Sequence, residues 1–403
     1  MATLVATAGW VLTRPDGTTP RLTSALPAGV EREPEERWSF DPGSEGYVAD
    51  TAESRDTVYV LYSDGDPRVV ALDKSTGEER WDERAGAGTP VHLSILGDQV
   101  VVVSNAPGGD EFSVDESEVV SLSADGDEQW SLEADGQAYQ ASSLGGALVV
   151  EGFEDESYTI SVDPGSGEER WSEEGRLVGH RGASAALVLT DQVSVVDVDD
   201  GRQRWSEDLG DYSAAGLVGE VVVIADSEDI VGLSLADGEE QWESDPGVGE
   251  VYGFQSAGPD NLLVFGEDGF AVIGSSGQAI WDDEAYQITP LERSGEAGLL
   301  VDRSEGDGAE LSVVRTSDGE EISSERARDH ALFREAGDGI VTDRPIAADA
   351  VYLRGEGSVL ALRLDDLEEL WELEVRSEFI GGLWAMDGAL ALVDDRGELL
   401  YFR

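Results

Sequence analysis

The chain has no cysteine and a single lysine, Lys74, among its 403 residues. The lack of cysteine excludes disulfides, thiolate metal sites, cysteine nucleophiles and haem attachment through a CxxCH motif. No apolar run has the length that a membrane-spanning helix needs. The sequence also has no G-x-S-x-G elbow, phosphate-binding loop or H-E-x-x-H pair. These absences exclude many familiar classes of enzyme.

Negative charge is what the sequence has in excess. The 87 Asp and Glu residues against 26 Lys and Arg give a net charge of −61. A folded chain of this charge repels itself in dilute buffer, and molar salt shortens the screening length from about 10 Å to about 3 Å. The acidic, lysine-poor composition therefore indicates a halophilic host, with an acidic secreted protein of a mesophile as the alternative. We expect no nucleic acid and no anionic membrane surface as partner, because both bind basic patches.

The N-terminal residues differ from the rest of the chain. The run MATLVATAGWVL is small and apolar, and a polar stretch rich in Pro, Thr and Gly follows it up to about residue 32. It resembles the apolar core of a secretory signal that lacks its basic start. We expect residues 1–32 to be the remnant of such a signal with a linker, or else a frayed tail. The signal interpretation predicts an exported, extracellular or cell-surface protein whose single domain spans residues 33–403.

One phrase recurs along the chain: an apolar run, a turn with Gly, and a Trp that follows two or three polar residues. In six copies the Gly stands four residues before the Trp: Gly77 and Trp81, Gly126 and Trp130, Gly167 and Trp171, Gly201 and Trp205, Gly238 and Trp242, and Gly277 and Trp281. Ser323 takes the Trp position of the seventh copy, and Leu367 takes the Gly position before Trp371 in the eighth. Trp38 ends a partial copy. The anchors are about 42 residues apart, the length of a four-stranded propeller blade.

A second apolar run precedes each phrase, as in TVYVLY (57–62) and EVVVI (220–224). These runs barely alternate between apolar and polar residues, which indicates strands that are buried on both faces. We expect them to be inner strands between neighbouring blades, and the phrase to form the outer hairpin with Gly at a φ > 0 position of its turn. The sequence therefore predicts an all-β propeller of four-stranded antiparallel blades.

The two ends of the repeat region complement each other. PEERWSF (34–40) is an outer strand with no blade before it, and GALALVDDRGELLYFR (388–403) is a pair of strands with no Trp strand after it. We expect them to pair and complete one blade, which removes the free sheet edges. The raw count is then nine blades. Because propellers typically have four to eight, we expect eight, with 282–323 or 324–371 as an incomplete unit, and nine as the alternative.

The segment Ala71-x-Asp73-x-x-Thr76-Gly77-x-x-x-Trp81 resembles the tryptophan-docking motif of propeller repeats of the pyrroloquinoline-quinone (PQQ) type. Ser161 to Trp171 resembles it with Ser for Ala and Ser for Thr. The resemblance covers about residues 36–403. In character the chain is similar to the PQQ-like propellers of haloarchaeal surfaces and to the bacterial outer-membrane assembly lipoprotein. Both likenesses imply a scaffold without catalysis in the propeller.

The family of PQQ-type propellers that this chain resembles also includes enzymes. PQQ enzymes hold the quinone over the channel with a calcium or lanthanide site, a catalytic Asp and often a vicinal disulfide. This chain has no cysteine, and no motif maps onto the metal ligands, so we expect no catalytic, cofactor-binding or metal-binding residue and no cofactor. The channel candidates are three histidines that follow an anchor by seven to eleven residues, in the position of an innermost strand: His92, His180 and His330. They would line a polar pore or hold a metal, or they are unrelated histidines at strand ends.

These observations favour a non-catalytic, exported, monomeric scaffold that binds proteins or a cell-surface polymer through its loops. The alternative is a small-molecule or sugar-binding propeller, or a PQQ-dependent dehydrogenase-like enzyme, that uses the channel mouth. The fold alone does not decide between these functions.

Overall fold

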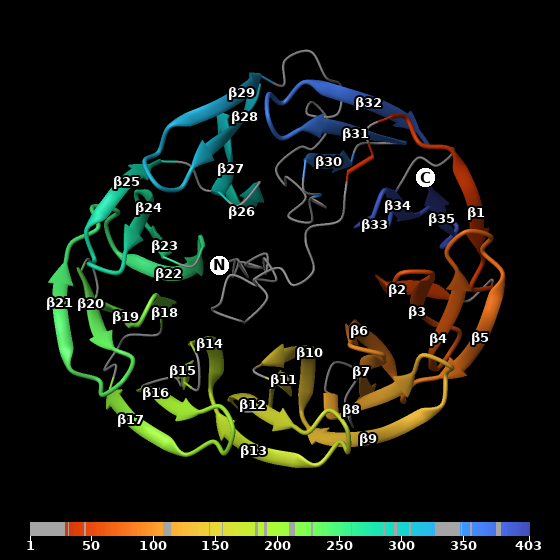
Figure 1. Cartoon of the computed structure of the whole chain (residues 1–403), viewed down its shortest axis with the longest axis horizontal. Coiled ribbons are helices and arrows are strands. Elements are labelled where there is room, and N and C mark those ends of the chain that lie inside the picture. The colour runs from red at the N-terminus through yellow and green to blue at the C-terminus, as the bar shows by residue number, and fades with distance from the viewer. Residues whose placement is uncertain are drawn as a thin grey trace, which may run out of the picture.

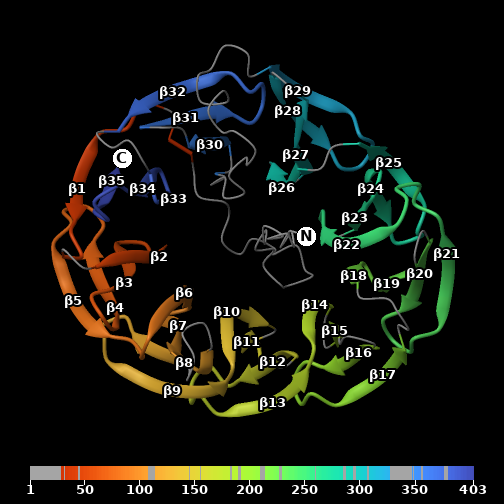
Figure 2. The same cartoon turned by 180° about the vertical axis from the view of Figure 1, so that it is seen from behind.

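The computed structural model shows β-sheets that follow one another in chain order around a ring (Figures 1 and 2). The structure describes residues 29–30, 32–43, 46–107, 114–144, 146–154, 156–181, 184–188, 192–208, 214–226, 229–258, 260–284, 287–293, 296–305, 308–326, 347, 349–354, 357–375 and 380–403. Within these ranges the strands form nine antiparallel sheets, eight of four strands and one of three. The predicted all-β propeller architecture is therefore confirmed.

We number the sheets from 1 to 9 along the chain. Sheet 1 contains β1 (Glu36–Phe40), β33 (Gly382–Met386), β34 (Ala389–Val393) and β35 (Leu399–Phe402). Sheet 2 contains β2 (Tyr47–Glu53), β3 (Thr57–Ser63), β4 (Pro67–Asp73) and β5 (Glu79–Arg84). Sheet 3 contains β6 (Thr89–Leu96), β7 (Gln99–Pro107), β8 (Val114–Ser123) and β9 (Glu128–Asp135). Sheet 4 contains β10 (Gln137–Leu144), β11 (Ala147–Phe153), β12 (Ser157–Val162) and β13 (Glu169–Glu174). Sheet 5 contains β14 (Arg176–Arg181), β15 (Ser184–Val188), β16 (Gln192–Asp197) and β17 (Gln203–Asp208).

The remaining sheets continue the pattern. Sheet 6 contains β18 (Ala215–Val218), β19 (Val221–Asp226), β20 (Asp229–Ser234) and β21 (Glu240–Ser244). Sheet 7 contains β22 (Val251–Ser256), β23 (Asn261–Gly266), β24 (Gly269–Gly274) and β25 (Ala279–Asp283). Sheet 8 contains β26 (Gln287–Arg293), β27 (Glu296–Glu305), β28 (Gly308–Arg315) and β29 (Glu321–Arg326). Sheet 9 contains β30 (Ala350–Arg354), β31 (Ser358–Arg363) and β32 (Glu369–Glu374).

Within each sheet the strands are ordered from the centre of the ring to its rim. In sheet 2, β2 lies innermost and β5 outermost (Figure 1). The second strand, β3, is buried at all of its seven positions, as its unbroken apolar run predicts. Outer strands such as β13, ERWSEE, expose several acidic side chains on either side of one Trp. Charged residues on an edge strand hinder pairing with another chain.

An apolar cluster fills each of the nine junctions between neighbouring sheets in the described residues. At the junction of sheets 1 and 2, Val58 and Val60 pack in one cluster with Ala391. At the junction of sheets 9 and 1, Tyr352 packs in one cluster with Leu390. Sheet 1 therefore packs on both of its neighbours, as every other sheet does.

Sheet 1 unites the two ends of the repeat region. Strand β1 pairs antiparallel with β35, and Trp38 lies opposite Tyr401. The rings of Trp38 and Tyr401 stack with centroids 4.4 Å apart and planes 5° apart. The backbones of Glu35 and Arg403 exchange hydrogen bonds of 3.3 and 3.0 Å. The predicted pairing of residues 36–40 with the last strands is therefore confirmed.

The number of sheets differs from our expectation. We expected eight blades, whereas the described residues form nine sheets, which is the raw count of the repeats. The additional sheet comes from the two irregular units. Residues 282–323 contain three strands of sheet 8 and the start of its fourth, and residues 324–371 contain two strands of sheet 9 and the start of its third. Buried apolar residues such as Val313 and Val351 hold these sheets together without the complete phrase. Within the described residues there is no helix with the length and apolar character to span a membrane.

Candidate functional site

The anchor residues form docking contacts that join the Trp of one sheet to the outer turn of the next. Trp81 of sheet 2 donates its indole N–H to the carbonyl of Ala124 in sheet 3, at 2.8 Å. The same bond, between 2.8 and 3.2 Å, recurs from Trp38 to Lys74, Trp130 to Pro164, Trp171 to Val198, Trp205 to Leu235, Trp242 to Ser275 and Trp281 to Thr316. The phrase therefore stabilises the junctions between sheets.

The Gly of each turn lies under the indole that docks there. Gly77 has φ +72°, which favours glycine, and a Cβ on it would lie 2.5 Å from the Trp38 ring. A side chain at this position would therefore strain the backbone and displace the ring. The same contact joins Trp81 to Gly126, Trp130 to Gly167, Trp171 to Gly201, Trp205 to Gly238, Trp242 to Gly277 and Trp281 to Gly319. Gly319 was missing from the predicted anchors because no Trp follows it, although its Asp-Gly turn has the same position in the phrase.

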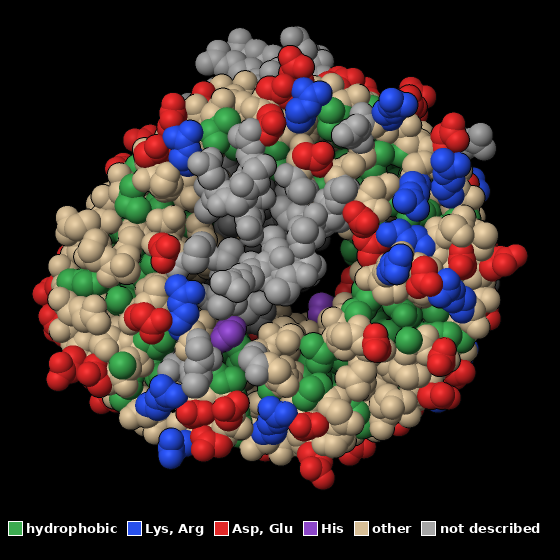
Figure 3. All heavy atoms as spheres, in the orientation of Figure 1, with side chains coloured by type: hydrophobic (Ala, Val, Ile, Leu, Met, Phe, Trp, Pro, Cys, Tyr) green, Lys and Arg blue, Asp and Glu red, His purple; other side chains and the backbone are tan. Residues whose placement is uncertain are grey.

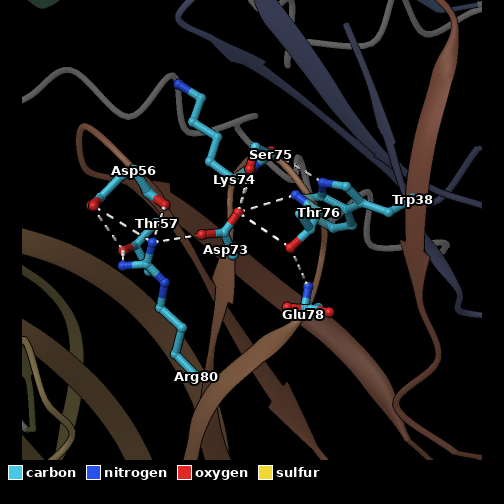
Figure 4. Close-up of polar contacts among 9 residues, drawn as sticks. All are labelled: Trp38, Asp56, Thr57, Asp73, Lys74, Ser75, Thr76, Glu78 and Arg80. Atoms are coloured by element: carbon cyan, nitrogen blue, oxygen red, sulfur yellow. Dashed lines mark hydrogen bonds and ion pairs between the residues drawn. The ribbon is translucent and has the colours of Figure 1, made fainter.

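A network of polar contacts shapes the turn that receives Trp38 (Figure 4). The Asp73 carboxylate accepts hydrogen bonds from the backbone N–H groups of Ser75 and Thr76, at 3.0 and 3.1 Å. The Arg80 guanidinium bonds the same carboxylate at 2.8 Å and also the Thr57 hydroxyl at 2.8 Å. These contacts, first of all the one with Arg80, hold the pKa of Asp73 well below its usual range. Equivalent Asp–Arg pairs are Asp163 with Arg170 and Asp197 with Arg204.

At the junction of sheets 8 and 9, the outer strand carries a small anchor residue and the turn carries a large one, the reverse of the junctions that pair a Trp with a Gly. Ser323 stands on β29 in the Trp position, and Leu367 stands in the Gly position of the following turn. Leu367 has φ +54° and is 1% exposed, within the apolar cluster that joins sheets 8 and 9. A large side chain in the turn thus accompanies a small one on the outer strand.

Residues 29–30, here called the docking segment, receive the last tryptophan. Trp371 donates its indole N–H to the carbonyl of Val30 at 2.5 Å, and the Val30 N–H donates to the Tyr352 hydroxyl at 2.9 Å. The Gly29 N–H donates to the Asp349 carboxylate at 2.8 Å. Val30 is buried in the cluster between sheets 9 and 1. The docking segment therefore occupies the place of the outer turn that sheet 1 lacks.

The single lysine also lies at a junction that involves sheet 1. Lys74 is 7% exposed, and its ammonium pairs with the Glu53 carboxylate. Glu53 also accepts a hydrogen bond of 2.5 Å from the Asp387 N–H, in the turn between β33 and β34. The pair therefore links sheet 2 to the closing sheet.

The innermost strands carry two of the three predicted channel candidates, His92 and His180. In five of them the register shifts by a β-bulge, between Val48 and Asp50, Pro90 and His92, Ala138 and Gln140, Leu177 and Gly179, and Val251 and Gly253. Bulges re-aim side chains and are common next to functional sites. Four of the five bulges lie in the consecutive sheets 2 to 5. The innermost strands of these four neighbouring sheets therefore all have a bulge.

Two of the three histidines lie on these bulged strands. His92 is on β6, and its Nδ1 lies 3.3 Å from the carboxylate of Asp50 on β2. Asp50 also accepts the N–H of Leu93 at 2.9 Å, so it links sheets 2 and 3. His180 is on β14, where burial and Arg181 lower its pKa. Figure 3 shows histidine side chains at the edge of the central opening.

The third histidine, His330, lies outside the described residues. The described residues bring no three His, Cys, Asp or Glu side chains together in a group that would hold a metal ion. His92 and His180 belong to sheets 3 and 5, with sheet 4 between them.

Sequence reasoning missed the buried acid of sheet 4. Glu151 on β11 is 1% exposed. Its carboxylate accepts the Gln140 side-chain amide at 2.5 Å and the Leu177 backbone N–H at 3.1 Å. Burial raises its pKa to about 7, although these hydrogen bonds and Arg176 act in the opposite direction. The signal in the sequence was an acid directly after the apolar run ALVV (147–150). We call Asp50, His92, Gln140, Glu151 and His180 the channel arc.

The repeats and their docking contacts can now be compared with known proteins. A family model described as outer membrane protein assembly factor BamB matches residues 28–176 and 155–403. The chain belongs to this family. The two matches of the BamB model together span all nine sheets, and the first begins beside the docking segment. No curated protein matches the chain.

Solved structures are similar to this chain at low sequence identity. The computationally designed protein Ika8 has a TM-score of 0.52 and 14% identity, covering 91% of this chain and 99% of its own. The quinohemoprotein alcohol dehydrogenase ADHIIG of Pseudomonas putida HK5 has a TM-score of 0.51 and 10% identity, covering 94% of this chain and 78% of its own. BamB of Moraxella catarrhalis has a TM-score of 0.45 and 11% identity, covering 92% of this chain and 99% of its own. The similarity to Ika8 and to ADHIIG supports the fold of this BamB-family protein. At such low identity it says nothing about the chemistry of the protein.

Proposed function

We propose that this chain is a non-catalytic, exported binding scaffold of a halophile, and that it engages a protein or a cell-surface polymer at the channel mouth. The observation that carries the proposal is the row of bulges in the innermost strands of sheets 2 to 5. The anchor residues are used in packing between sheets, whereas the bulged innermost strands carry polar residues such as His92 and Gln140. The family description as an assembly factor supports a role in binding.

The charge of the chain restricts the partner. At −61, the scaffold repels nucleic acid and acidic polymers, and it attracts basic surfaces. Acidic side chains on outer strands such as β13 hinder sheet-to-sheet pairing between copies. We therefore propose a monomer, which sedimentation equilibrium in molar KCl would test.

Binding is tested by comparison of matched variants. Immobilised wild-type protein is exposed to an envelope extract of the source cells in molar KCl, beside His92→Ala and Ile280→Ala. His92 lies on the channel arc, whereas Ile280 is 40% exposed on the outer strand β25. We expect one partner to be retained by the wild type and by Ile280→Ala and to be lost by His92→Ala. Equal retention by all three proteins would exclude the channel arc as the binding surface.

A further inference from the structure

Glu151 bridges the innermost strands of two neighbouring sheets. One carboxylate oxygen accepts the side-chain amide of Gln140 on β10, in its own sheet. The other accepts the backbone N–H of Leu177 on β14, in sheet 5. Gln140 directly follows the bulge of β10, and Leu177 directly precedes the bulge of β14. The carboxyl group thus connects the two irregular points of the inner wall.

The Leu177 N–H needs this acceptor. Strand β14 is the inner edge of its sheet, so N–H groups that point away from β15 have no strand partner. Leu177 is 3% exposed, and water therefore has little access to this group. A buried N–H without an acceptor is costly, which makes the Glu151 contact important for the position of β14.

The groups around Glu151 leave its charge without a close counter-ion. No described cation lies within ion-pair distance of it, and Arg176 on β14 acts on it only through longer-range attraction. Tyr139 on β10 and Tyr158 on β12 stay neutral because burial raises the pKa of both phenols. His180, further along β14, has a lowered pKa. Burial of a carboxylate without a counter-ion favours its protonated form.

We propose that Glu151 is a proton-operated clasp between sheets 4 and 5, which holds β14 and the part of the channel arc on it when neutral and loosens when ionised. In the neutral form the carbonyl oxygen accepts the Leu177 N–H, and the acid O–H donates to the Gln140 side-chain oxygen after the amide has rotated. In the ionised form the buried charge draws water into the junction, and the contact opens more often. Taken as regulation of partner binding, the clasp rests on the proposed function.

The direction of the pH effect follows from the raised pKa. Burial raises the pKa of Glu151 to about 7 in the folded chain, from an ordinary value of 4.5. The neutral clasp therefore contributes stability that is fully present below about pH 4.5 and is lost as pH rises through about 7. Sheets 4 and 5 should hold together more firmly at pH 6 than at pH 8.

Hydrogen exchange of the Leu177 amide in molar KCl tests the clasp. We expect its rate, corrected for intrinsic exchange, to rise about tenfold or more between pH 6 and pH 8, since one pKa unit corresponds to a factor of ten. Glu151→Gln keeps an acceptor for Leu177 and cannot ionise, so its corrected rate should stay constant. The matched control is Asp50→Asn, which alters the analogous Asp50–Leu93 contact between sheets 2 and 3. This variant should keep the wild-type pH response at Leu177.

The outcomes separate the clasp from the proposed function. A corrected Leu177 rate that does not change with pH in the wild type, or that rises equally in Glu151→Gln, would overturn the clasp. This readout needs no partner, so it stands even if the binding experiment with His92→Ala fails. Conversely, loss of partner binding in His92→Ala with a pH-independent Leu177 rate would support the scaffold and refute the clasp.

Discussion

The indole N–H of Trp371 bonds the carbonyl oxygen of Val30, 341 residues earlier in the chain. Every other docking contact described here joins a Trp to a turn in the next repeat, about 27–43 residues away. At sheet 1 the chain has no continuous outer turn, because β35 and β1 come from opposite ends of the repeats. The docking segment therefore supplies the acceptor, and the junction of sheets 9 and 1 depends on it.

Two truncations test the docking segment. Removal of residues 1–28 keeps Gly29 and Val30 and should leave the free energy of unfolding nearly unchanged. Removal of residues 1–31 deletes the buried Val30 and leaves the Trp371 N–H without its acceptor, so it should cost about 2–5 kcal/mol. Urea unfolding in molar KCl measures the difference. Two truncated proteins of equal stability would show that the docking segment does not support the junction.

A double-mutant cycle tests whether Ser323 and Leu367 are coupled at the junction of sheets 8 and 9. Ser323→Trp alone should destabilise the fold by about 1–3 kcal/mol, because its indole meets the buried Leu367. Leu367→Gly alone relieves the positive φ but leaves a cavity, at a net cost of about 1–3 kcal/mol.

Together the two changes restore the arrangement of Trp281 on Gly319, so the double variant should be more stable than either single one. Ser323→Ala serves as the control that changes the size of residue 323 very little. Strictly additive effects of the two substitutions on urea unfolding would mean that the two positions do not couple.

Repeat spacing in the sequence was sufficient to predict the architecture and much of its packing. The Gly–Trp phrase predicted the outer hairpins, and the incomplete ends predicted that β1 pairs with β35. The phrase did not reveal Val30, because the docking segment has neither Gly four residues before a Trp nor a turn of its own. The raw count of the phrase matched the nine sheets, and the expectation of eight came from the usual number of blades in propellers. Buried residues of β28 and β31 hold sheets 8 and 9 in place without the complete set of anchors.

The channel arc was less predictable than the junctions. The positions of His92 and His180 on innermost strands followed from their offset to the anchors, as the structure confirms. Their neighbours did not follow, because a bulge shifts the register by one residue and thereby changes which side chain points to the channel. The role of Glu151 depends on a backbone N–H of the next sheet, Leu177, and no side-chain pattern encodes that contact.

Trp38 should be among the most costly docking residues to remove. It is 8% exposed and stacks on Tyr401, so Trp38→Ala should lower the free energy of unfolding by about 3–5 kcal/mol. Trp242 makes an equivalent hydrogen bond of 2.9 Å but remains only partly buried. Trp242→Ala should therefore cost less than Trp38→Ala in the same urea unfolding experiment. The reverse order would indicate that burial of the ring does not set the strength of docking.

The stability of the ring should depend on salt, and unevenly so around its circumference. Residues 215–283, which include sheets 6 and 7, have 15 Asp and Glu and no Lys or Arg. Residues 47–84, which form sheet 2, have 10 Asp and Glu but also five Lys and Arg. In sheet 2 the cations form ion pairs such as Arg68 with Asp82. Repulsion in dilute buffer should therefore be strongest in sheets 6 and 7, because residues 215–283 contain no cation of their own to offset their acidic side chains.

We expect the melting temperature to rise from about 0.1 M to molar KCl as the screening length falls from about 10 Å to about 3 Å. Hydrogen exchange should locate the effect. Backbone amides of β19 and β23 should gain more protection on addition of salt than those of β3 and β4. Sodium sulfate at equal ionic strength separates screening from the general strengthening of apolar burial by salting-out ions, which acts on all sheets alike. An unchanged melting temperature, or equal gains in sheets 2, 6 and 7, would contradict local charge as the cause of salt dependence.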